Sequence, residues 1–600
     1  MSDPRKPGRN AWAELTSSWI PDEDLRRLAA YRLMAAYDSN QVGQVAAIAG
    51  DGDAAVERRE LGDASKLVDT ALGYLLGAEQ TIIVPGAEGA AETPTPESVE
   101  ALAVQQALRD WAEKELLLFR IQQAERTALL LGDGVYTLAW DPAKRRVLLR
   151  SWDPGLYFPE WPEDEQDGAE FPLRVHLAWE LPEDEQRGLK ARLRRVTYEL
   201  GPIAPSSRTA PPGKDGRSVR ETVYSSDGAS LLTPGDTLNA ATGAITRAYP
   251  WAPDTPSAWT CYLTDAEWNL DDLKRGDLLY DLPQHKATYR VRSDGEVLDR
   301  LDIMVDFIPV VHITNNIPHS GDHWGKPILA TVLQGLDELS ATDTDSSGAS
   351  ATTGTPIIGL AGARLPIDRT TGQPLPLKIQ PGTVWQLNDS GRMDVLDTSA
   401  QLAELRARVD HLLDRIAANS RLTAAGLGTL DPTALPSGYA LQLALGPLDS
   451  LVAAMRLARA HKYAVLLRMV QRLHQAGQAE GWPVGESLPA RLMWGPHTPT
   501  DRAAVLDEVV KGVSAGVLSV ETGVRMLIDA GYPITDAQEE IHRIQSRAFD
   551  AAARLADATG DNAAVRDYLR LPEADSGVPP VPLLPNREAA GEGAPRRGPE

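Results

Sequence analysis

The sequence has one cysteine, few phenylalanines and no long apolar run. Because Cys261 stands alone among 600 residues, the chain cannot form an intrachain disulfide or a zinc site with two cysteine ligands. We expect Cys261 to be a buried structural thiol in a protein of a reducing compartment. The apolar stretches are short or interrupted, and the N-terminus is charged, so neither a membrane-spanning segment nor a signal peptide is expected.

Positive charge is also scarce. Lys and Arg number 60 against 84 Asp and Glu, which gives a formal net charge of −24. That balance argues against a protein that grips nucleic acid over its whole surface by neutralising phosphates. It is compatible with a surface past which DNA moves. The length allows about four domains, or one large elongated fold with several subregions.

The motifs of common enzyme chemistry are missing. The string 321–327 has the wrong spacing for a phosphate-binding loop and a proline where a magnesium-binding hydroxyl is required. The string 343–348 imitates the start of a calcium loop, but Gly354 replaces the required glutamate, and a capped helix end is favoured. His319 and His323 are interpreted as a surface turn rather than a metal pair. We therefore predict no catalytic residue, no metal and no cofactor.

Hydrophobic periodicity in the first half predicts an α+β body. Helices are expected from Asp22, over 64–76, and over 96–131 as one long helix. Residues 201–257, rich in Pro, Gly, Ser and Thr, are expected to be long loops with short strands. The expected strands cover residues 81–84, 135–140, 146–152, 174–179, 194–200, 286–292 and 306–313.

The second half predicts two helices around a small β unit. The first covers 327–345 and is expected to end in the Ser/Thr/Gly stretch 346–355. The β unit is expected around 356–360 and 382–387. The second helix carries an apolar stripe of Leu402, Leu405, Val409, Leu412, Leu413 and Ile416.

The C-terminal third is predicted to be mostly helical. A Gly/Pro-containing loop, 421–437, leads into a long helix over 438–475 with a kink at Gly446–Pro447. Farther on, Ser519 is a good N-cap and Gly531 a good helix stop. From about Leu571 the composition predicts disorder.

Four stretches together resemble, in their order and spacing, the portal proteins of tailed bacteriophages. The resemblance extends over roughly residues 60–550, and the inserted loops 201–257 depart from it. The stretches are Leu129–Tyr136 with Trp140–Pro142 and Trp152–Pro159; Ile308–His312 with Trp324–Pro327; Ser437–Leu441 with Pro447–Leu448; and Ala515–Thr522 followed by 534–544.

The resemblance implies a portal-like subunit: an α/β wing, a two-helix stem, a small β-rich clip, a long kinked helix and a helical crown. It assigns the regions as follows: 1–325 to N-terminal helices and wing, 326–345 to the descending stem helix, 346–398 to the clip, 399–420 to the returning stem helix, 421–437 to the tunnel loop, 438–497 to the long kinked helix and wing return, 498–571 to the crown, and 572–600 to a disordered tail.

The resemblance also implies a ring, usually a dodecamer, at one capsid vertex, through which double-stranded DNA is packaged and ejected. The implied partners are terminase, a head-completion or adaptor protein, and the major capsid and scaffolding proteins. The location is the virion after assembly in the host cytoplasm, with no membrane and no enzymatic activity. A soluble multidomain hydrolase with an unrecognised site is the alternative.

Three sets of residues are assigned roles on this basis. A single copy is expected to leave the stem stripe poorly covered, and neighbouring copies to bury it. The acids can equally be a solvated helix face. Basic residues of the long helix can instead pair with a neighbour's acids; these are Arg456, Arg459, Lys462, Arg468 and Arg472. The sets are the tunnel loop Arg421, Gly426, Gly428, Asp431 and Pro432; the stem acidic face Asp337, Glu338, Asp343 and Asp345; and the stem packing residues Leu405, Val409, Leu412 and Ile416.

Overall fold

The structure is a computed structural model of mixed helix and sheet, and it divides into two compact units, residues 1–499 and 500–600. Each unit is treated by itself. The structure describes residues 17–43, 59–87, 94–162, 171–209, 220–292, 295–354, 358–361, 392–395, 399–430, 438–497 and 502–532, apart from positions 185, 187, 240 and 320, and a few positions between 534 and 554.

Two N-terminal helices pack as their sequence predicts. Helix α1 (Asp22–Asp38) buries Leu28 and Met34, whereas Leu33, expected on the same side, is exposed. Helix α3 (Asp63–Leu76) buries the whole apolar stripe read from its sequence.

The long helix expected over residues 96–131 is two helices, so that prediction is wrong. Helix α4 (Pro96–Lys114) ends before Leu116, whose φ of 53° is left-handed, and α5 (Leu117–Leu131) starts after it. The break lets the preceding carboxylate, Glu115, form an ion pair of 2.8 Å with Arg146. The sequence has no glycine or proline at the break, so the break carries no local signal.

A three-stranded sheet lies at the centre of the α/β body. The words wing and stem serve below only as names, for this body and for the helix pair α6 and α7. Its order is β15 (Val310–Thr314), β2 (Asp133–Asp141) and β3 (Arg146–Trp152), all antiparallel. Helices α5 and α8 (Gly438–Ala476) pack on it. The strands match the predicted ones closely because their apolar alternation is strong.

A second, six-stranded sheet lies farther from the stem. It contains β4 (Tyr157–Glu160), β5 (Arg174–Leu181), β6 (Arg192–Pro202), β12 (Trp259–Asn269), β13 (Thr288–Tyr289) and β14 (Leu301–Asp302). The strand expected over 286–292 shrinks to two residues, and β12 occupies the strand-like stretch around Cys261, for which no strand range was predicted. The carboxylates Asp265 and Glu267 interrupt the apolar alternation of β12. They are stable in the sheet because Arg194 and Arg192 of the neighbouring β6 pair with them.

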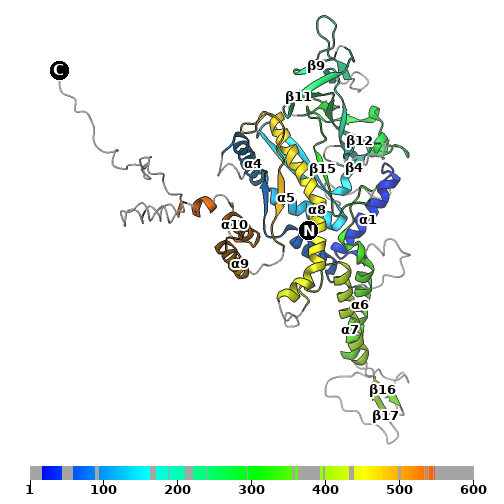
Figure 1. The fold of residues 1–600 in the computed structure, drawn as a ribbon. Helices are drawn as coiled ribbons and strands as arrows, with labels where there is room; N and C mark the ends of the chain where they lie inside the picture. The colour runs from blue at the N-terminus through cyan, green and yellow to red at the C-terminus, as the bar shows by residue number, and fades with distance from the viewer. Residues whose placement is uncertain are drawn as a thin grey trace, which may run out of the picture. The chain divides into compact units, whose positions relative to one another are not determined.

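The region 201–257 is an insertion of short strands, as its composition predicts. It holds a two-stranded ladder, β7 (Ser207–Thr209) with β8 (Arg220–Thr222). A three-stranded sheet follows, β9 (Asp236–Leu238), β10 (Ile245–Tyr249) and β11 (Ala252–Ser257). Figure 1 shows this insertion beyond β12, on the side of the wing away from α6 and α7.

Two antiparallel helices leave the wing together. A 3-10 turn (Ile328–Thr331) leads into α6 (Leu333–Gly354), and α7 (Ser399–Asn419) returns beside it. Strands β16 (Ile358–Ala361) and β17 (Arg392–Val395) pair with each other beyond the ends of these helices (Figure 1). The predicted second strand, 382–387, lies outside the described residues.

Helix α6 continues through the Ser/Thr/Gly stretch that was expected to end it, so that expectation is wrong. Side-chain hydroxyls of Ser340, Thr342 and Thr344 donate to the carbonyl oxygens four residues earlier, at 2.8–3.0 Å. These three hydroxyls lie in the turns just before the stretch and are satisfied inside the helix. The calcium-like string lies within this continuous helix and forms no loop.

After the stem the chain returns to the wing. Helix α8 is continuous across Pro447, and β18 (Arg491–Trp494) pairs with β1 (Gln80–Ile83). By length and composition alone, the described segment Ala440–Ala476 could cross a membrane. A core helix passes the same test, and the second half of α8 lies in the main hydrophobic core with Tyr463, Leu466 and Val470.

The second unit contains two helices among its described residues. Helix α9 (Arg502–Ser514) is followed by α10 (Val520–Asp529). The Ser519 hydroxyl accepts a hydrogen bond from the Thr522 amide at 3.1 Å, which confirms the predicted N-cap. Gly531, with φ of 81°, confirms the predicted stop. A capping box at 535–538 predicts a further helix, and the described positions 537, 540–544, 546, 547 and 554 are helical. The tail 572–600 lies outside the described residues.

Candidate functional site

The candidate site is the stem hairpin, α6 and α7, and its junctions with the wing. Leu412 and Ile416 of α7 are buried, and Leu405 and Val409 are half-buried. Helix α6 of the same chain supplies their cover. The expectation that a single copy leaves this stripe poorly covered is therefore wrong at its wing end.

The four acids assigned to one stem face lie on different sides of α6. Asp337 is half-buried and accepts a hydrogen bond of 2.7 Å from the Tyr37 hydroxyl of α1. Glu338 is exposed and lies 3.4 Å from Arg408 of α7. Asp345 is exposed as well.

Asp343 is the fourth acid, and its surroundings differ from those of the others. It is half-buried, and desolvation raises its pKa above the ordinary range, with Asp63 adding to the shift and Arg59 opposing it. Of the four acids, Glu338 and Asp345 thus form the exposed pair on the helix, whereas Asp337 and Asp343 are turned towards N-terminal elements.

A groove of about 690 Å³ runs between the two stem helices on one side. Leu412 and Ile416 contribute apolar surface to it, and two arginines of α7 contribute positive charge. The lining residues are Thr331, Val332, Gln334, Gly335, Glu338, Arg408, His411, Leu412, Arg415, Ile416 and Asn419.

The first part of the predicted tunnel loop is packed. Leu422 is fully buried, and the Tyr74 hydroxyl of α3 donates to the Gly426 carbonyl oxygen at 3.0 Å. A Cβ on Gly426 would collide with the Leu422 carbonyl oxygen. Arg421 is exposed, and Gly428 has φ of 70°.

The remaining tunnel-loop residues, Asp431 and Pro432, lie outside the described part of the chain. Residues 421–428 thus form an anchored connector between α7 and α8.

The start of the stem is fixed to the wing by a buried carboxylate. Asp133 of β2 accepts hydrogen bonds from the Tyr31 hydroxyl (2.6 Å), His312 Nε2 (2.8 Å) and the Gly325 amide (2.9 Å). Beside it the guanidinium of Arg27 lies 4.1 Å from the ring centre of Trp324. Burial and the nearby Asp133 carboxylate raise the pKa of Tyr31 well above its ordinary value, so the phenol remains a donor.

Sequence reasoning did not assign a role to this junction. Its signal was present in two of the strings that carry the portal resemblance, around Gly132–Gly134 and Trp324–Pro327. A Cβ on Gly325 would collide with the Gly132 carbonyl oxygen. The two glycines therefore permit a close backbone crossing that larger residues would prevent.

Three arginines of α8 that were considered for contacts with a neighbour have partners within the chain. Arg459 is fully buried, with its Nε 2.5 Å from Glu125 Oε2 of α5. Arg456 donates to the carbonyl oxygens of Leu75 and Gly495, and Arg472 lies 3.7 Å from Asp306. That expectation is thus wrong for these three residues.

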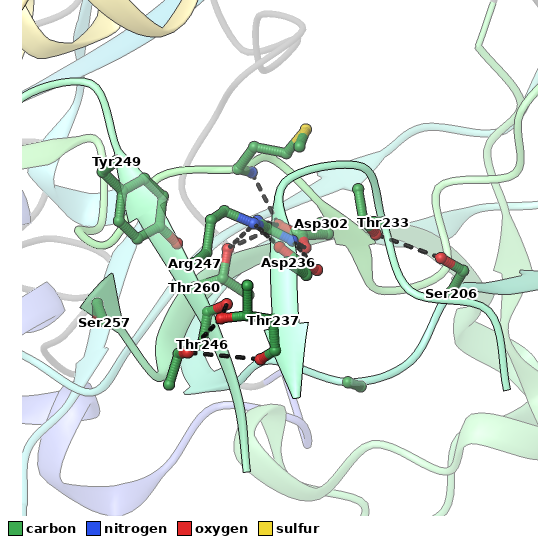
Figure 2. Close-up of polar contacts among 12 residues, drawn as sticks. Ser206, Thr233, Asp236, Thr237, Thr246, Arg247, Tyr249, Ser257, Thr260 and Asp302 are labelled. Atoms are coloured by element: carbon green, nitrogen blue, oxygen red, sulfur yellow. Dashed lines mark hydrogen bonds and ion pairs between the residues drawn. The ribbon is translucent and has the colours of Figure 1, made fainter. Parts of the chain in front are cut away.

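A second ion cluster holds the insertion on the wing. Arg247 of β10 is buried and makes two bonds each to Asp236 of β9 and Asp302 of β14. Figure 2 shows both carboxylates converging on this one guanidinium, with the Thr260 hydroxyl donating to Asp302 at 2.6 Å. Paired bonds of this kind raise the pKa of Arg247 further, and the cluster fixes where the inserted sheet starts.

Cys261 and the pair His319 and His323 have structural surroundings, and His319 is exposed. Cys261 is fully buried, as expected, and burial raises the pKa of its thiol. The ring of His323 stacks on Trp161 with ring centres 3.8 Å apart. Within the described ranges, no three metal-ligating side chains form a cluster.

Comparisons with known proteins give weak structural neighbours. No protein-family model and no curated protein sequence matches the chain. It is similar to a chain in the neck of an empty gene transfer agent particle, with TM-score 0.35 and 11% identity over 88% of this chain and 97% of that one. A chain from the virion of a native gene transfer agent particle gives TM-score 0.33 and 11% identity, over 81% and 98%. At this level of similarity, neither fold nor function is transferred to the chain.

Proposed function

We propose that this protein is the subunit of a portal ring, a conduit for double-stranded DNA at one vertex of a phage-like particle, without enzymatic activity. The observation that carries the proposal is the stem: two antiparallel helices that project from an α/β body and carry a paired β unit at their far end. Such a hairpin is a stalk, and a ring of stalks encloses a channel.

The dimensions of the stem support this role. Helix α6 has 22 residues and α7 has 21, which corresponds to about 30 Å of length at 1.5 Å per residue. That length is long enough to form a tubular segment between a wider body and a smaller clip. The junction at Asp133 attaches the start of the stem to the wing, and the packed connector after α7 attaches its end.

The charge balance supports passage of DNA rather than binding. The net charge of −24 repels phosphate, and a wall that repels phosphate lets a duplex slide. Among the stem acids, Glu338 and Asp345 are both exposed and lie on the same side of α6, where Glu338 also pairs with Arg408.

The remaining regions take the roles of a portal subunit. The part of the chain between the end of α6 at Gly354 and the start of α7 at Ser399 forms the clip, which binds terminase during packaging and an adaptor protein afterwards. Residues 498–571 form a crown facing the capsid interior, where the major capsid and scaffolding proteins are the partners. The ring is a dodecamer in this proposal, and it assembles before DNA enters the particle.

The test is the mass and image of the purified protein. Twelve copies of 64.9 kDa give a ring of roughly 0.8 MDa, visible as an annulus by negative-stain microscopy. A chain that remains monomeric at micromolar concentration, or that hydrolyses a substrate with a turnover that follows the monomer peak, contradicts the proposal.

A second test concerns the channel. Shortening the segment after the packed connector, by replacing 429–436 with two glycines, should leave rings intact and reduce retention of DNA in assembled particles. Residues 421–428 are kept because Leu422 and Gly426 are packed against the wing. Normal packaging and retention with the shortened segment would remove any role of this loop in the channel.

A further inference from the structure

Helix α7 presents two different charged surfaces on opposite sides. One surface is the wall of the groove between the stem helices, to which α7 contributes Arg408, His411 and Arg415. The other carries Asp410, Leu413 and Asp414, all of which are exposed. We call the first the stem groove and the second the acidic knob.

The positions of these residues around the helix place the surfaces apart. At about 100° per residue, Asp410 lies about 160° from Arg408 by the shorter way round the helix, whereas Asp414 lies about 100° from Arg415. Leu412 and Ile416 occupy the sector between them that faces α6. A single molecule therefore cannot bring its own knob into its own groove.

The stem groove is apolar at its base and positive along one wall. Gly335 lines this groove as well, and the side chain of Ile416 packs directly against its backbone, so the two helices lie close together at this point. Arg408 shares its charge with Glu338 in a solvent-exposed pair. Within the part of the chain that the structure describes, Arg415 has no ion-pair partner.

The acidic knob has the complementary composition. Leu413 is 37% exposed although its neighbours Leu412 and Ile416 are buried. The flanking carboxylates of Asp410 and Asp414 form no ion pair with any described residue, and Arg406 lies one turn before them on the same side. An exposed leucine between two acids matches a groove with an apolar base and an arginine wall.

We propose that the acidic knob of one copy docks into the stem groove of the next copy around a ring. Leu413 of one copy enters the stem groove of the next, and Asp410 and Asp414 pair with Arg415 and Arg408 along its wall. The contact is heterologous, because each copy offers a knob on one side and a groove on the other. This inference rests on the proposed ring, and it identifies the surfaces that close it.

Charge reversal tests the contact without disturbing the folded chain, because the altered residues are exposed. The knob variant is Asp410→Arg with Asp414→Arg, and the groove variant is Arg408→Glu with Arg415→Glu. Each variant alone should reduce the fraction of protein in rings by about tenfold or more, because like charges then meet at every contact. The matched control, Glu100→Arg with Asp110→Arg on α4, should assemble as the wild type does.

Mixing provides the decisive measurement. In an equimolar mixture, the arginine knob of one variant faces the glutamate groove of the other, and the wild-type knob faces the wild-type groove. Rings with an even number of copies should therefore return, and a single chain carrying all four changes should also assemble. Rings at the wild-type level in both single variants overturn the interface but leave the proposed function intact.

Failure of the mixture and of the four-change chain to assemble also overturns the interface. A wild-type chain that forms no ring overturns the proposed function, and the interface with it.

Covalent trapping gives a second readout, because the native Cys261 is buried. Leu413→Cys combined with Gln334→Cys should give a ladder of disulfide-linked multimers on oxidation, whereas either change alone should give at most dimers. A chain that stays monomeric under those conditions, while rings are present, also contradicts the docking.

Discussion

Gly335 of α6 faces Ile416 of α7 so closely that a Cβ added to the glycine would stand 3.1 Å from Ile416 Cγ1. The two stem helices are in near contact at this point, and the side chain of Ile416 takes the place that a larger residue on α6 would need. The separation of the helices is thus set by one glycine near the wing end of the stalk.

The first prediction compares two glycines of the same helix. Gly335→Leu should push α7 away from α6 and destabilise the stem by about 1–3 kcal/mol through overpacking. Gly348→Ala should instead stabilise it by up to about 1 kcal/mol, because a Cβ there meets nothing within 4 Å and alanine favours the helix. Amide exchange of the two stem helices measures both effects, and equal effects of the two changes would contradict the close contact.

The second prediction concerns neighbouring leucines of α7. Leu412→Asp places a carboxylate in the buried contact with α6 and should cost several kcal/mol, which separates the stem helices while the wing remains folded. Leu405→Asp, at a half-buried site, should cost less. Leu413→Asp should leave the stability of the single chain unchanged, since this leucine is exposed. Hydrogen exchange of stem and wing amides, measured along a thermal unfolding curve, distinguishes unfolding of the stem alone from unfolding of the whole unit.

The third prediction concerns the buried pair Arg459–Glu125. Removing one partner, by Arg459→Met or Glu125→Leu, leaves a buried charge without compensation and should cost about 3–5 kcal/mol. The double variant should cost much less than the sum of the single ones. A double-mutant cycle by chemical denaturation measures the coupling, and additive losses would show that the two groups do not depend on each other.

The fourth prediction is a dependence of stability on pH. Burial lowers the pKa of His474 to about 4, while its hydrogen bond to the Val470 carbonyl oxygen opposes the shift. Between pH 6.5 and about 4, His474 therefore binds a proton in the unfolded chain but stays neutral in the folded chain. Stability is lost as the pH falls through this window, by roughly 3 kcal/mol from this group.

His474→Phe provides the check for that group. The ring stacks on Trp482 with centres 4.3 Å apart, and phenylalanine keeps the stack but cannot bind a proton. The slope of the unfolding free energy against pH should fall by about one proton between pH 6.5 and 4 in the variant. His176, whose pKa burial also lowers, remains in both proteins, so only the difference between the two slopes is informative.

The fifth prediction addresses the insertion. Arg247→Met leaves Asp236 and Asp302 facing each other without their shared guanidinium, so the short strands should detach from β12 and β14. Limited proteolysis should then cut within 220–257 much faster than in the wild type. Arg220→Met, which removes a more exposed arginine of the same region, is the control and should not increase cleavage to that extent.

The outcome of the sequence interpretation followed the strength of local patterns. The stripe of α3, the strands β2 and β3, the amphipathic α7 and the caps at Ser519 and Gly531 were predictable, because periodicity or capping chemistry specifies them. The break at Leu116 was not, since only a tertiary ion pair of Glu115 marks it.

The unexpected features depend on partners far away in sequence. Strand β12 was hidden because its carboxylates are compensated by arginines some 70 residues earlier. The extension of α6 to Gly354 was not predicted, because Ser, Thr and Gly are weak helix formers and frequent at helix ends. The Asp133 junction joins residues about 190 positions apart, which no local pattern reveals. The sequence of α7 alone does not show that Leu413 is exposed while Leu412 is buried, because this depends on which side of α7 packs against α6.

The pairing of β1 with β18 joins residues 80–83 to 491–494 and has a consequence for the order of folding. During synthesis, β1 leaves the ribosome about 400 residues before its partner strand, and α8 emerges only after the entire stem. The wing therefore cannot close its core until the stalk has been made, and the early strands wait with open edges. A chain of such high contact order folds slowly, so premature encounters between unfinished wings compete with folding. Slower translation across residues 440–497 would prolong that exposed interval and should lower the yield of folded subunits.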